Sequence, residues 1–167
     1  MKNTISKAEL SRAEDAVNQA LLAAYGPMNV QGEQLCWEGR IRRAVEKADE
    51  LINSGKLTRE KVVGIIDGFQ QEYNAALHDA RKAQDEYFDL CKQAGITPKR
   101  FQRPQCPCNA CKERIRYEAA DGLEQAMQAM LESFTDDTVS TARRWWQQCQ
   151  ELGVTLELDF FLSKVVF

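Results

Sequence analysis

The feature that most constrains the fold is a long heptad pattern in the middle of the chain. Apolar residues recur there at alternating steps of four and three, which places them on one face of an α-helix. They are Val62, Ile66, Phe69, Tyr73, Ala76, Ala80, Ala83, Tyr87 and Leu90. Thr58 can cap the start of this helix, and Gly95 followed by Pro98 is a typical helix stop. The pattern predicts one long central helix over about 58–94, with its apolar face covered by other helices.

Shorter helices are predicted before this segment. Ser6 and Glu9 have the spacing of a capping box, and apolar residues follow at helical intervals until Gly26 and Pro27 end the run. A second amphipathic pattern covers roughly 32–53. Both patterns predict helices that need a partner surface for their apolar sides.

Two further helices are predicted after the central one. Asn109 can cap a fourth helix, and Thr135 can cap a fifth, which ends at Gly153. The 167 residues are therefore expected to form a single all-α domain, 1–167, of about five helices. Such a chain is long enough to bury a core without disulfides.

The C-terminal tail has a different period. Apolar residues at 154, 156, 158, 160 and 162 alternate with polar ones, which is typical of a half-buried strand. A short last helix from Asp159 onward is the alternative, and periodicity does not separate the two. Because an unpaired strand invites pairing, we expect the segment 154–167 to join a second copy or a partner chain.

Composition points away from membranes and from export. The chain has no apolar run of the length that a membrane span requires. Its first residues lack the apolar stretch and the small-residue cleavage site of a secretory signal, so a cytoplasmic location is expected. In a reducing compartment the six cysteines are expected to serve as thiols or metal ligands rather than as disulfides.

The charge of the chain is unevenly distributed. The formal net charge is -3, yet the stretch 92–116, here called the basic segment, has a local net charge of +6. The rest of the chain must then carry -9. A basic segment on an acidic body is expected to attract nucleic acid, or an acidic protein surface, at that segment alone.

Three cysteines lie within the basic segment, in the run Cys106-Pro107-Cys108-Asn109-Ala110-Cys111. Zinc takes four ligands in a tetrahedron, so three thiolates from one loop need one more. Cys91, at the end of the long helix, is the expected fourth ligand, with Cys149, Cys36 and His78 as the next choices. The alternatives are an iron-sulfur cluster, a set of reduced thiols, or a redox pair.

Catalytic chemistry has little support in the sequence. His78 is the only histidine, which excludes mechanisms and metal sites that need two. The chain has no glycine-rich phosphate loop, dinucleotide fingerprint or serine elbow. We therefore expect a non-enzymatic protein.

The expected function is binding through a metal-stiffened basic loop at about 95–111, as a regulator or inhibitor would bind. The partner would be nucleic acid or a nucleoprotein assembly with an acidic surface. The alternative is a protein-interaction module that acts through the long helix or the apolar tail. The expected contact residues are Lys99, Arg100, Phe101, Arg103, Lys112, Arg114 and Arg116.

Overall fold

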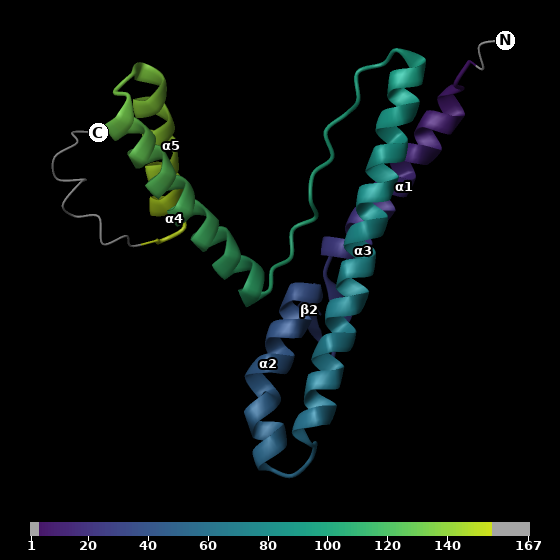
Figure 1. The fold of residues 1–167 in the computed structure, drawn as a ribbon, viewed down its shortest axis with the longest axis vertical. Helices are drawn as coiled ribbons and strands as arrows, with labels where there is room; N and C mark the ends of the chain where they lie inside the picture. The colour runs from purple at the N-terminus through teal and green to yellow at the C-terminus, as the bar shows by residue number, and fades with distance from the viewer. Residues whose placement is uncertain (1–3, 155–167) are drawn as a thin grey trace. The chain divides into compact units, whose positions relative to one another are not determined.

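The computed structural model describes residues 4–154 and confirms the all-α fold (Figure 1). The described residues form five helices and one small antiparallel hairpin. The helices are α1 (Lys7–Tyr25), α2 (Trp37–Asn53), α3 (Arg59–Ala94), α4 (Asn109–Glu132) and α5 (Asp136–Glu151), and the strands are β1 (Met28–Val30) and β2 (Glu33–Leu35). None of the described helices is long and apolar enough to cross a membrane.

The chain divides into two compact units, 1–111 and 112–167. The first contains α1, the hairpin, α2, α3 and the loop that leads to α4, and the second contains the rest of α4 together with α5. The single domain expected from chain length stays a prediction. The strand or helix expected after residue 154, and the pairing expected through it, lie outside the described residues.

The long central helix is confirmed as α3, and its ends are the predicted ones. The Thr58 side chain accepts a hydrogen bond from the Lys61 N–H, which satisfies a free amide of the first turn. Gly95 ends the helix with φ of 69°, in the left-handed region that favours glycine. The intervening 36 residues have no proline, so nothing in the sequence interrupts the helix.

Helix α1 packs along the C-terminal half of α3 (Figure 1). The capping box predicted at Ser6 and Glu9 is present at its start. The shared core consists of Val17, Leu21 and Ala24 from α1 with Ala80, Tyr87 and Cys91 from α3. This cluster is the main hydrophobic core of the first unit.

Helix α2 covers the N-terminal half of α3 and runs beside it as a helical hairpin (Figure 1). Trp37 lies against Phe69 with ring centroids 6.2 Å apart, and the Tyr73 hydroxyl donates to Glu38 at 3.0 Å. The apolar stripe of α3 is less covered here than we expected. Val62 is buried, whereas Ile66, Phe69 and Tyr73 are only half-buried.

The second helix was predicted to begin at 32, and that start is wrong. Residues 28–35 form a β-hairpin with Met28 opposite Leu35 and Val30 opposite Glu33. Gln31 and Gly32 make the turn with φ of 52° and 86°, the positive values that a two-residue hairpin turn of type I′ requires. Helix α2 therefore begins only at Trp37, directly after the hairpin.

The basic loop between α3 and α4 is irregular, as predicted, but it is held against the helices of the first unit. Phe101 meets Tyr87 edge to face with ring centroids 5.0 Å apart, and the Lys99 backbone N–H donates to the Tyr87 hydroxyl at 3.2 Å. The Lys99 ammonium also pairs with Glu14 of α1 at 2.8 Å. These contacts fix the first half of the loop on α3 and α1.

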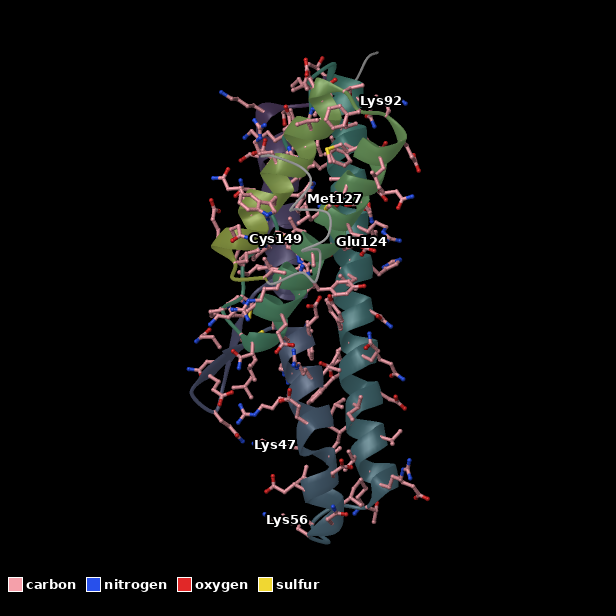
Figure 2. The ribbon with its side chains drawn as sticks, turned by 90° about the vertical axis from the view of Figure 1, so that its left-hand side faces the viewer. Lys47, Lys56, Lys92, Glu124, Met127 and Cys149 are labelled. Carbon is pink, nitrogen blue, oxygen red and sulfur yellow. The ribbon has the colours of Figure 1, made fainter. Side chains whose placement is uncertain are left out.

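In the second unit, α4 and α5 pack against each other through apolar residues. Met127 of α4 and Cys149 of α5, both labelled in Figure 2, belong to one buried cluster with Ala119 and Leu123. Thr135 caps α5 and Gly153 follows its end with φ of 65°, as the sequence predicts. Phe134 lies beyond the end of α4 and is 76% exposed.

Candidate metal centre

Four cysteines converge at one place in the first unit. They are Cys36, Cys106, Cys108 and Cys111, all buried, with their sulfur atoms within 4.8 Å of one another. Leu35, Val30 and Ala110 pack around them. Among the described residues this is the one group of cysteine, histidine and acidic side chains whose ligand atoms gather in this way.

Two separate arms of the chain bring the sulfur atoms together. Cys36 follows strand β2 and is the cap residue of α2, so the tight turn at Gln31 and Gly32 fixes where it lies. The other arm is the end of the basic loop, where Cys106 and Cys108 flank Pro107 and Cys111 lies in the first turn of α4. The Cys106 thiol points at the Gln34 carbonyl of β2, 3.8 Å away, which joins this arm to the hairpin.

The sulfur separations fit a tetrahedral metal ion. Cys36 Sγ is 3.3 Å from Cys111 Sγ and 3.9 Å from Cys108 Sγ. Four sulfurs bound to zinc at about 2.3 Å would lie about 3.8 Å apart along the edges of the tetrahedron. These two separations bracket that value, and all four sulfurs lie within 4.8 Å of one another, so the four residues could hold a metal ion after small adjustments.

The surroundings shift the pKa values of two of the thiols in opposite directions. Burial raises the pKa of the Cys36 thiol, and the neighbouring thiols of Cys111 and Cys108 raise it further. The hydrogen bond from the Gly39 backbone N–H acts in the opposite sense but does not outweigh them. Burial acts on Cys108 in the same sense, but the Cys111 backbone N–H and the neighbouring thiols outweigh it and lower the pKa of Cys108. The surroundings thus favour the thiolate at Cys108 and oppose it at Cys36, so a bound cation would help to hold the Cys36 sulfur as a thiolate.

The backbone around the centre also favours negative charge. Cys36 and Cys108 each stand directly before a helix, α2 and α4 respectively. The N-terminus of a helix carries a partial positive charge, which stabilises thiolates beside it. Gly39, in the first turn of α2, leaves space for Cys108, because a Cβ at this position would lie 2.9 Å from Cys108 Sγ.

The fourth ligand expected from the sequence was Cys91, but in the structure Cys36, one of the next choices, lies beside the other three cysteines. Cys91 is 1% exposed in the core between α1 and α3, away from the four-cysteine group. Cys149 is buried in the second unit, where its thiol donates to the Ala119 carbonyl at 3.2 Å. His78 is exposed on α3, next to Asp79. Cys106, Cys108 and Cys111 are brought together as predicted.

Several of the expected contact residues are already engaged within the chain. Arg103 donates to Glu38 at 3.1 Å and lies over the Tyr25 ring, 3.8 Å from its centroid. Arg114 pairs with Glu118 at 2.8 Å along α4. Lys99 and Phe101 make the contacts with Glu14 and Tyr87 given above. Arg100, Lys112 and Arg116 are exposed.

Glu38 is a functional candidate that no pattern in the sequence indicates. Its carboxylate accepts from Tyr73 of α3 and from Arg103 of the loop, and it lies two residues after Cys36. It therefore connects the arm that carries Cys36, the loop that carries the other three cysteines, and the long helix. Acidic residues are common in the first turn of helices, where they are usually solvated. The sequence alone therefore does not distinguish Glu38 from such a residue.

Comparison with protein-family models, with curated proteins and with solved structures finds no match to this chain.

Proposed function

We propose that the chain is a non-enzymatic regulatory or inhibitory binding protein, in which a zinc centre stiffens the basic segment for docking on nucleic acid or a nucleoprotein assembly. The observation that carries the proposal is that three of the four clustered cysteines lie within the basic segment. A metal bound there would fix the end of the loop and the start of α4 together. Cations held in a fixed arrangement lose less conformational entropy when they bind phosphates.

Zinc is proposed because of the ligand chemistry. Four thiolates in a tetrahedron suit zinc or iron, and zinc is the usual ion of structural sites with four cysteines. With four protein ligands no coordination position is left for a substrate or for a reactive water. The centre would therefore contribute to folding and rigidity rather than to catalysis, which supports a binding protein.

The charges of the basic segment limit which residues would contact a polyanion. Lys99 and Arg103 are each paired with a carboxylate of the first unit, so they contribute less net charge at the surface. Phe101 packs on Tyr87, so we do not propose that its ring stacks on a base. Arg100 before the cysteines and Lys112 directly after them are exposed, and we propose these two as the main phosphate contacts.

The test is charge reversal of these two cations in the full chain. Arg100→Glu with Lys112→Glu should weaken binding to mixed-sequence RNA or DNA at least about tenfold and make the affinity less dependent on salt. The matched control reverses Lys47 on α2 and Lys56 in the turn that follows it (Figure 2). Both are exposed and lie outside the basic segment. Filter binding at two salt concentrations gives both readouts.

An equal affinity in the two double variants and the native chain would contradict the proposal. A protein-interaction module would then be favoured, because Val45 on α2 and Val63 and Ile65 on α3 leave apolar side chains 43–54% exposed on the helical hairpin. Exposed apolar side chains of this kind are common at protein interfaces. Arg103 is left unchanged in the test because its contacts with Glu38 and Tyr25 would confuse binding with folding.

A further inference from the structure

We infer that the four-cysteine centre is a peroxide-sensitive switch, in which oxidation of Cys36 together with Cys108 or Cys111 expels the metal and leaves the basic segment attached to the hairpin at a single point. This inference rests on the zinc centre proposed above. It concerns what regulates that centre, and it depends on how the four sulfurs are distributed between the two arms of the chain.

Cys36 is the residue that makes the centre vulnerable. It is the single ligand from the hairpin arm, and its sulfur lies 3.3 Å from Cys111 Sγ and 3.9 Å from Cys108 Sγ. Thiols this close need little movement to form a disulfide once one of them is oxidised. Cys108 and Cys106 are the more exposed members, at 8% and 7%, so the loop side of the centre is the side that a small oxidant reaches first.

The oxidant is hydrogen peroxide, and the step balances as a two-electron oxidation. A thiolate of the loop arm would attack one peroxide oxygen, the O–O bond would break, and a sulfenic acid and hydroxide would form. The Cys36 thiolate then attacks the sulfenic sulfur, an S–S bond forms, and the second oxygen leaves as hydroxide. Two protons from solvent convert both hydroxides to water. Two thiolates have lost one electron each, and peroxide has gained two.

The metal cannot stay after this step. Only two thiolates would remain for zinc, and a structural zinc site needs four ligands. The basic segment would then be joined to the hairpin by one disulfide only. The two loop cysteines outside that disulfide would no longer be held in place. Because the proposed binding depends on that fixed arrangement, affinity for nucleic acid should fall upon oxidation and return upon reduction in the presence of zinc.

The test uses the full-length protein purified with its metal and treated with a small excess of hydrogen peroxide. Released zinc is followed with a chromogenic chelator, and the disulfides are mapped by mass spectrometry of unreduced peptides. We expect one zinc released per chain, a disulfide that includes Cys36, and recovery of bound zinc after a dithiol and zinc are added. Cys91→Ser and Cys149→Ser, which alter buried thiols outside the centre, should release zinc at the same rate as the native chain.

The outcomes separate the switch from the zinc centre itself. Protein that holds zinc but keeps it under peroxide overturns the switch and leaves the centre in place. A disulfide confined to Cys106, Cys108 and Cys111, without Cys36, also overturns it. Protein that contains no metal as purified overturns the proposed zinc centre, and with it the switch.

Discussion

Gly39 is the residue at which the sequence of α2 and the geometry of the metal centre depend on each other most directly. It lies in the interior of the first helical turn, where a glycine costs about 1 kcal/mol of stability relative to alanine. A Cβ here would lie 2.9 Å from Cys108 Sγ and 3.3 Å from Leu35 Cδ2. The missing side chain is therefore explained by the closeness of the Cys108 sulfur.

Gly39→Ala should weaken metal binding. The added methyl group would push Cys108 away from the other sulfurs, and disturbing the surroundings of a metal ligand typically costs 10- to 100-fold in affinity, so a loss of about that size is expected. Cobalt titration, with the thiolate-to-cobalt absorption as readout, measures this directly. Gly64→Ala in α3 is the control, because no heavy atom lies within 4 Å of that Cβ position. It should leave affinity unchanged and raise stability slightly. Equal affinity in both variants would show that Gly39 does not constrain the site.

The ligand set shows how far residue-level reasoning from sequence reaches. Cys106, Cys108 and Cys111 could be selected because they are neighbours in the chain, and a local loop brings them together. The fourth ligand could not be selected in that way. Cys91 is closer in sequence, but the core between α1 and α3 takes its side chain, whereas Cys36 is brought in by a hairpin about 70 residues earlier.

At the scale of the elements, helices with strong caps and long apolar patterns could be predicted. The bounds of α3 follow from Thr58 and Gly95, and those of α5 from Thr135 and Gly153. The hairpin could not, since its strands have three residues each, too few to show a clear alternation of apolar and polar side chains. Gly32 in the turn is the main indication of a hairpin in the sequence. The helical pattern that begins near Trp37 was extended back to residue 32, so the prediction missed this turn.

The contact between α4 and α5 depends on a glycine in the same way. A Cβ at Gly122 would lie 2.8 Å from the Trp145 ring, so Gly122→Ala should destabilise the second unit by about 1–3 kcal/mol through overpacking. Urea unfolding of the full chain measures the loss. Leu131→Ala on the same helix is the control, because Leu131 is 63% exposed and its truncation should cost little.

Metal affinity should be unchanged in both α4 variants, since all four ligands belong to the first unit. A Gly122→Ala chain as stable as the native one would mean that the indole of Trp145 does not lie on this glycine. A change in metal affinity would mean that the packing of α5 influences the centre, which the two compact units give no reason to expect.

At the scale of the whole molecule, the chain combines an acidic body with a basic segment, and three of the four clustered cysteines lie within that segment. Sequence alone gave the charge asymmetry and the all-α class. It could not show that Lys99 and Arg103 form ion pairs with Glu14 and Glu38, because those carboxylates come from helices distant in the sequence. We therefore expect Arg100 and Lys112, rather than all the cations of the basic segment, to make the main contacts.

The central claim is that Cys36, Cys106, Cys108 and Cys111 hold one metal ion per chain. Native mass spectrometry of protein purified without chelator, with elemental analysis of the same sample, tests it most directly. The native chain and Cys91→Ser should each carry one zinc, and Cys36→Ser should lose it, because three thiolates no longer close the tetrahedron. A native chain without stoichiometric metal, or a Cys36→Ser chain that keeps its zinc while Cys91→Ser loses it, would contradict the account.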